Sequence, residues 1–127
     1  MLPTTTSAAL EVTSLLPGLA DKVLVNALRA LIPSVSAIDF SFRTEKPFSS
    51  AVLYNLLNEH STPYSIIGFT DKPLVSSDLK ARPESLVISM LEATGSEKGL
   101  NRVFGWYDNK WGFSNRMLDM CQLIAQH

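Results

Sequence analysis

The stretch RVFGWYDNKWGFSNR, residues 102–116, decides how this sequence is interpreted. It holds both tryptophans of the chain, together with one tyrosine and two phenylalanines, around a short polar centre. Its first half fits the end of a strand, and its second half fits the start of a helix from about Trp111 to Ala125. An amide such as Asn109 at this junction, walled by aromatic rings, is suited to hold a ligand. The alternative is that Asp108 or Asn109 caps the helix while the rings fill a core.

Composition bounds the possible classes of protein. The chain has 127 residues, of which 46% are apolar and 18% charged, with a formal net charge of −1. These values predict one soluble globular domain over residues 1–127, with no membrane span. The charge balance argues against nucleic acid as a primary ligand, although Arg102, Lys110 and Arg116 lie among aromatics that could stack on RNA bases. A single cysteine and two histidines argue against a metal site, and with no signal sequence they favour a reducing intracellular compartment, cytoplasm or organelle matrix.

Hydrophobic periodicity predicts the order helix, strand, strand, helix, strand, strand, strand, helix. The helices are expected over residues 4–16, from Ser49 or Ser50 to His60 before Pro63, and over 111–125. The strands are expected over residues 22–32, 34–43, 64–69, 85–93 and 100–107, the first of them largely covered. Because several strands follow one another through short turns, we predict an α+β fold with a mostly antiparallel mixed sheet and helices on one face.

Two candidate anion-binding features lie near the N-terminus. The stretch PTTTS precedes the first helix, where hydroxyls and free backbone N–H groups suit an anion; the simpler interpretation is that Thr6 or Ser7 caps the helix. Arg29 shares one face of the predicted strand with apolar residues, so it needs an anionic partner or a route to water. That partner is either a phosphate or Asp39 on the next strand.

Taken in order, the motifs resemble a known family. They are PTTTSAA, an arginine within a strand, SVSAIDFSFRTEKP, LVSSD and GWYDNKWGFSNR. This series resembles the C-terminal part of the catalytic domain of glyceraldehyde-3-phosphate dehydrogenase, where PTTTGAA, VSVVDL with LEKP, VVSSD and SWYDNE-GYSNR occur. The resemblance covers residues 2–127, and its WYDN-x-x-G-[FY]-S-N-R motif is highly specific.

The resemblance implies roles for individual residues. Thr6, Ser7 and Arg29 correspond to phosphate ligands, with Ser7 in place of the family's glycine. Asn109 corresponds to the asparagine that holds the nicotinamide carboxamide, and Phe113 replaces the family's tyrosine. Other departures from the family pattern are Lys110, where the family has an acidic residue, and Ala30-Leu31, where it has Val-Pro.

Several parts of the family's catalytic apparatus do not occur in this sequence. It contains neither the Ser-Cys-Thr-Thr-Asn-Cys motif of the nucleophile, nor the histidine that activates it, nor a G-x-G-x-x-G dinucleotide fingerprint. Cys121 falls on the apolar stripe of the last helix and is no substitute. We therefore expect a pseudoenzyme with no catalytic residues and no cofactor, NAD entering only if a partner chain supplies the cofactor domain.

The expected function follows from apolar surface that is covered in the family and would be exposed in this chain alone. In the family, the final helix packs on the cofactor domain, and the sheet meets a neighbouring subunit. The stripe on that helix is therefore expected to bind other subunits or a second copy of the chain; it comprises Phe113, Met117, Met120, Cys121 and Ile124. The alternatives are that this helix folds onto its own sheet, that the chain is the C-terminal half of a split NAD-dependent dehydrogenase, or that it is part of a longer protein.

Overall fold

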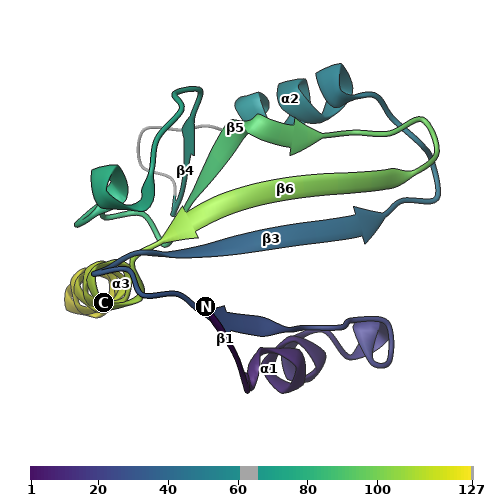
Figure 1. Ribbon diagram of the computed structural model, residues 1–127. Coiled ribbons are helices and arrows are strands. Elements are labelled where there is room, and N and C mark those ends of the chain that lie inside the picture. The colour runs from purple at the N-terminus through teal and green to yellow at the C-terminus, as the bar shows by residue number, and fades with distance from the viewer. Residues whose placement is uncertain (61–65, 127) are drawn as a thin grey trace. The chain divides into compact units, whose positions relative to one another are not determined.

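The computed structural model describes residues 1–60 and 66–126, and it divides into two compact units, Met1–Ile32 and the chain from Pro33 onward (Figure 1). Both units contain helices and strands, and consecutive strands such as β5 and β6 pair directly, which confirms the predicted α+β class. The expectation of a single domain over residues 1–127 stays a prediction.

The first unit is a pair of short strands with one helix between them. Its elements are β1 (Leu2–Thr4), α1 (Ala8–Leu15), the 3-10 turn η1 (Pro17–Leu19) and β2 (Ala27–Arg29), with β1 antiparallel to β2. The predicted helix thus starts at Ala8 rather than at residue 4, because β1 occupies the preceding residues.

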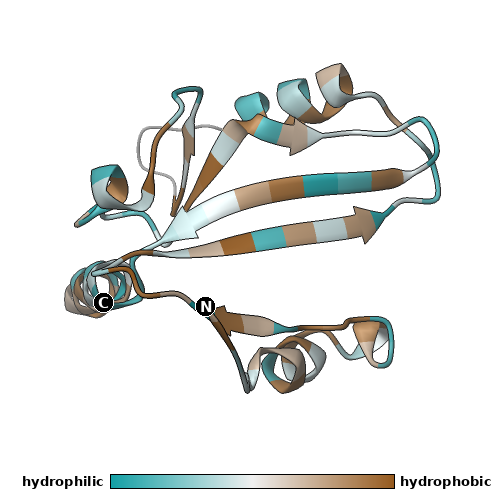
Figure 2. Ribbon diagram, viewed as in Figure 1, coloured by the Kyte–Doolittle hydropathy of each residue, from teal (hydrophilic) through white to brown (hydrophobic). Residues whose placement is uncertain are grey.

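The predicted strand over residues 22–32 was largely wrong. Only Ala27–Arg29 forms a strand, since β1 offers only three residues to pair with it. The prediction of a largely covered strand also fails within this unit: Leu24 is 88% exposed and Leu31 is 99% exposed. Figure 2 shows that this part of the chain is largely hydrophobic, which is why a covered strand was predicted.

The second unit is built on a four-stranded sheet in the order β3-β6-β5-β4. The strands are β3 (Ser36–Arg43), β4 (Ile67–Thr70), β5 (Leu86–Thr94) and β6 (Leu100–Tyr107). The β3–β6 and β6–β5 pairs are antiparallel, whereas β4 and β5 are parallel. The predicted mixed, mostly antiparallel sheet is therefore confirmed.

Two helices and one 3-10 turn complete this unit: α2 (Ser50–Glu59), η2 (Ser76–Leu79) and α3 (Asn109–Ala125). The hydroxyl of Ser49 caps α2 by accepting from the Val52 amide, as predicted, and α2 packs on β5. Within α2, Leu53 is 3% exposed and Leu56 is half exposed. The predicted helix stop at Pro63 lies outside the described residues.

The buried core of the second unit is small. Its buried apolar residues are Val35, Leu53, Leu79, Val87, Ile88 and Met90. Val35, Leu79 and Val87 form one cluster, with Leu74 and Trp106 packed against it. Of the aromatic rings in residues 102–116, Trp106 packs against this cluster and fixes the end of β6, whereas Trp111 is 50% and Phe113 is 66% exposed. The interpretation in which these rings fill a core therefore holds only in part. The start of α3 follows directly from that anchored strand.

Candidate functional site

The entry of α3 is held by a single carboxylate. Asp108 accepts a hydrogen bond from the Trp111 amide at 3.2 Å through Oδ1 and another from the Ala81 amide at 3.3 Å through Oδ2. The first bond caps the helix, as the sequence predicted for Asp108 or Asn109. The second ties α3 to the loop after η2. These backbone donors, Trp111 first, lower the pKa of Asp108.

Asn109 and Phe113 share one face at the start of α3, because they lie four residues apart. Both are exposed, and Phe113 has 66% of its surface accessible. Within the described residues the Asn109 carboxamide makes no hydrogen bond to the rest of the chain. The side chains that the resemblance relates to nicotinamide binding are therefore adjacent and accessible, while Asp108 performs the capping.

Replacing Asp108 with alanine is expected to lower the free energy of unfolding by about 0.5–2 kcal/mol at pH 7, the usual cost of losing a helix cap. The pKa of Asp108 is lower in the folded chain, so its contribution is present above the unfolded value of about 4 and is lost as pH falls through the folded value. Urea unfolding at pH 7 and pH 3 measures both effects. The difference in unfolding free energy between Asp108→Ala and wild type should be smaller at pH 3 than at pH 7.

The control is Asp71→Ala, which removes an exposed aspartate near the end of β4 and should change the unfolding free energy by less than about 0.5 kcal/mol. Equal losses for the two variants would contradict the capping role. A loss of unfolding free energy in Asp108→Ala that is as large at pH 3 as at pH 7 would also contradict it.

The first turns of α3 attach it to the rest of its unit. Gly112 is buried, and a Cβ there would lie 3.1 Å from the Glu84 carbonyl oxygen. Arg116 reaches Ser85 Oγ at 3.4 Å with one terminal nitrogen and Asp119 at 2.8 Å with the other. The Arg116–Asp119 pair lies within α3, whereas the close approach at Gly112 and the Arg116–Ser85 bond attach the start of the helix to the segment before β5.

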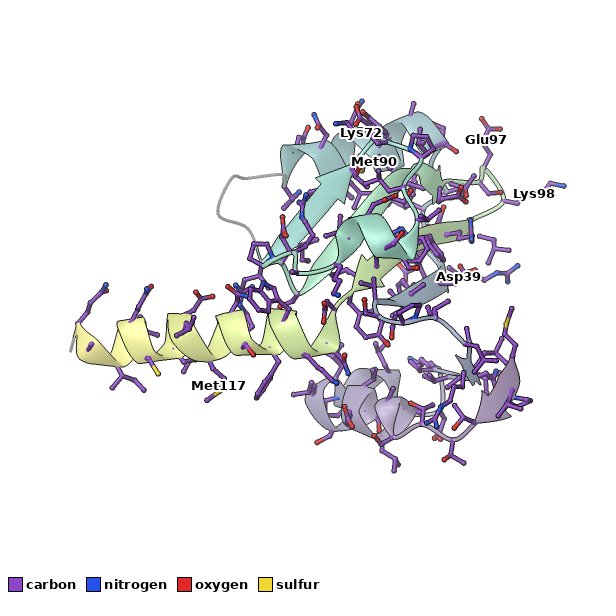
Figure 3. The ribbon with its side chains drawn as sticks, turned by 60° about the vertical axis from the view of Figure 1, so that its left-hand side comes forward. Asp39, Lys72, Met90, Glu97, Lys98 and Met117 are labelled. Atoms are coloured by element: carbon purple, nitrogen blue, oxygen red, sulfur yellow. The ribbon has the colours of Figure 1, made fainter. Side chains whose placement is uncertain are left out.

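The remainder of α3 extends away from the sheet of this unit, with Met117 projecting into the open (Figure 3). The predicted stripe is exposed throughout: Phe113 66%, Met117 51%, Met120 54% and Ile124 69%, with Cys121 also exposed. The alternative in which this stripe packs on the sheet of its own unit is therefore wrong. Four of these residues follow the 4-3-4 spacing of a helix-packing seam.

The N-terminal anion corner has its own internal partners. Thr6 Oγ1 accepts from the Ala8 amide at 3.2 Å, so Thr6 makes the local hydrogen bond expected of a cap. Ser7 makes no capping bond and instead donates to Glu11 Oε1 at 2.6 Å. Arg29 is exposed on β2, opposite Leu2 of β1. The Glu11 carboxylate thus accepts a hydrogen bond from the Ser7 hydroxyl, which the resemblance relates to phosphate binding.

Asp39, which the sequence suggested as a partner for Arg29, has a partner within its own unit. On β3 it accepts from Arg102 of β6, at 2.8 Å from Nε and 3.1 Å from Nη2, while Arg102 Nη1 reaches Glu92 of β5 at 3.0 Å. This network raises the pKa of Arg102, through Asp39 first and then Glu92. This network could not be predicted from the sequence, because it depends on the register of three strands.

No thiol or metal site comes together in residues 1–60 and 66–126. Cys121 is exposed on α3, and His60 directs Nδ1 at the Leu56 carbonyl oxygen, 2.8 Å away within α2. No cluster of three metal-ligating side chains occurs in that part of the chain. No helix within the described residues is long and apolar enough to cross a membrane.

Comparison with known proteins gives a consistent match. Residues 1–109 fit the family model described as glyceraldehyde 3-phosphate dehydrogenase, C-terminal domain. The glyceraldehyde-3-phosphate dehydrogenase of Zymomonas mobilis is 36% identical over 99% of this chain and 38% of its own length. Those of Xanthobacter flavus and Podospora anserina are 39% and 32% identical, over 94% and 100% of this chain and 36% and 38% of their own lengths. The chain thus spans less than two fifths of the relatives that it matches.

Proposed function

Because the chain belongs to the glyceraldehyde 3-phosphate dehydrogenase family, matching its C-terminal domain over residues 1–109, we propose that these 127 residues act as a docking module. The module binds another polypeptide through α3 and carries out no complete reaction by itself. The observation that carries this proposal is the exposed apolar stripe on α3.

The amount of uncovered surface supports a docking role. Phe113, Met117, Met120 and Ile124 each have more than half of their surface exposed on one face of α3. Soluble monomers rarely expose large contiguous apolar patches, and such patches often mark binding surfaces.

The chemistry available within the 127 residues supports the non-catalytic part of the proposal. An enzymatic thiol needs a neighbouring base or positive charge to form a thiolate. Cys121 lies on a helix face among apolar residues, and His60 is engaged within α2. The sequence holds no second cysteine and no G-x-G-x-x-G fingerprint. A nucleophile, its base and a dinucleotide fold would all have to come from elsewhere.

The isolated 127 residues are expected to show no NAD-dependent oxidation of glyceraldehyde 3-phosphate, because whole functional groups are absent rather than weakened. The assay follows NADH absorbance with purified protein and with Cys121→Ser as the matched variant. Turnover that survives purification and disappears in Cys121→Ser would contradict the proposal.

A second candidate is favoured by the accessible Asn109 carboxamide beside Phe113. In this view the chain is one half of a split dehydrogenase, and a partner chain supplies the cofactor domain, the cysteine and the histidine. The test is the sequence of chains that copurify with it. A partner bearing Ser-Cys-Thr-Thr-Asn-Cys, with NADH formation only after mixing, would support this candidate over the docking module.

The anion corner gives a test of what the N-terminal unit retains. We expect inorganic phosphate to bind weakly at the site that the resemblance gives to Thr6, Ser7 and Arg29, because Glu11 holds the Ser7 hydroxyl and repels an anion. Glu11→Gln should therefore bind phosphate several-fold more tightly, and Arg29→Ala should not bind it. Amide NMR shifts of residues 5–8 at low salt report both. Unchanged shifts in Arg29→Ala, or weaker binding in Glu11→Gln, would contradict this account of the corner.

A further inference from the structure

A cavity of about 400 Å³ opens on one face of the β5–β6 pair and lies wholly in the second unit. It is a shallow hollow that is open to solvent rather than an enclosed site. The segment before η2 forms one wall and the two strands form the floor. The lining residues are Pro73, Leu74, Val75, Ser89, Leu91, Glu92, Arg102, Phe104 and Trp106.

The floor of the cavity is aromatic. Phe104 and Trp106 meet edge to face, with ring centroids 5.0 Å apart and an interplanar angle of 88°. Leu74, on the wall, packs against the core together with Trp106. Such a surface favours a flat apolar ring, because ring edges and faces attract one another in this geometry.

One buried polar group faces the same side of the sheet. Ser89 pairs with Phe104 in register, so the two side chains share a face, and Ser89 is only 7% exposed. Its hydroxyl makes no hydrogen bond within residues 1–60 and 66–126, although buried hydroxyls are normally paired. The Ser89 hydroxyl is also not one of the described side-chain groups that are both shielded from solvent and without a hydrogen-bond partner, so it keeps some contact with solvent. The Ser89 hydroxyl is therefore available to a molecule in the cavity.

The rim of the cavity is unfavourable for anions. The Arg102 guanidinium is already bound by Asp39 at 2.8 Å and Glu92 at 3.0 Å. These three side chains carry one positive and two negative charges, and the printed bonds already engage Nε, Nη1 and Nη2 of Arg102. A further carboxylate or phosphate therefore meets net repulsion at this rim.

We propose that this cavity binds a planar aromatic molecule that carries a hydrogen-bonding group and no negative charge. The ring lies against Phe104 and Trp106, and its polar group pairs with the Ser89 hydroxyl. The proposal uses none of the residues of the α3 stripe, so it stands or falls independently of the docking function.

Three probes with the same ring separate the contributions of shape and charge: neutral indole, cationic tryptamine and anionic indole-3-acetate. Titrating each into the ¹⁵N-labelled 127-residue chain should give saturable shifts at the amides of residues 89, 104 and 106. Indole and tryptamine are expected to bind with a Kd of order 1 mM or below, as suits ligands of this size. Indole-3-acetate should bind several-fold more weakly.

Variants test whether the probe occupies this cavity. Ser89→Ala should weaken indole binding roughly twofold to tenfold, the value of one hydrogen bond. Leu91→Asp, at a lining residue that is 59% exposed, should abolish it without unfolding the chain, whereas Leu100→Asp, at a residue 55% exposed on β6 outside the cavity, should leave it unchanged. The proposal is overturned by an absence of saturable shifts up to about 10 mM. It is equally overturned by equal affinity for the anionic probe, or by binding that Ser89→Ala and Leu91→Asp leave intact.

Discussion

Replacing Met117 and Ile124 together with aspartate is expected to release the chain from the polypeptide that we propose covers α3, with a loss of affinity of at least about 100-fold. Burying each of these side chains is worth roughly 1.5–3 kcal/mol, and two buried charges add a further penalty. The chain itself should stay folded, because Met117 is 51% exposed and Ile124 is 69% exposed in the described structure. Affinity is measured by titration against the purified partner, and folding by circular dichroism.

The matched control places the same two charges on another face of the helix. Leu118 and Gln122 lie four residues apart and are both exposed, and Leu118→Asp with Gln122→Asp should leave binding largely intact. Loss of binding in both double variants would show that added charge, rather than the stripe, is responsible. Unfolding of the Met117→Asp, Ile124→Asp chain would mean that the stripe belongs to its own core.

Leu79→Ala is expected to lower the free energy of unfolding of the second unit by about 2–5 kcal/mol, as for other large-to-small core substitutions. Leu79 is 2% exposed and packs with Val35 and Val87. Since this core is small, such a loss takes a large share of the total stability. Urea unfolding monitored by tryptophan fluorescence is a suitable measurement, because Trp106 packs against the same cluster.

Leu100→Ala is the comparison for this prediction, because Leu100 is 55% exposed and lies outside the core. It should change the free energy of unfolding by less than about 1 kcal/mol. Similar losses in the two variants would contradict the assignment of the core to η2 and β5.

The parts of the fold that the sequence predicted well depend on local patterns. The pair formed by β5 and β6 follows from two alternating segments joined by a glycine-containing turn. The entry of α3 follows from an aspartate placed where a helix cap is needed, and Asp108 does bind the Trp111 amide. Both features are decided by residues close together in the chain, so neither required knowledge of the tertiary structure.

The parts that failed depend on distant or competing partners. Residues 22–32 are apolar enough for a buried strand, but the strand formed is only as long as β1 allows. Thr6 or Ser7 was expected to cap α1, and Thr6 makes the local bond while the Ser7 hydroxyl donates to Glu11 one turn later. Strand register gives Asp39 the Arg102 guanidinium, a partner that spacing along the chain did not indicate. The cavity around Ser89 depends on the same register and could not be predicted from spacing.

Methionine oxidation in the native assembly tests the docking claim most directly, because the chain carries its own controls. Met1 is 87% exposed and Met90 is 7% exposed, while Met117 and Met120 on the stripe are 51% and 54% exposed. With dilute hydrogen peroxide and mass spectrometry, Met117 and Met120 should oxidise nearly as fast as Met1 in the isolated chain. In the native assembly they should become as protected as Met90. Rapid oxidation of both stripe methionines in the native assembly would contradict a docking role for α3.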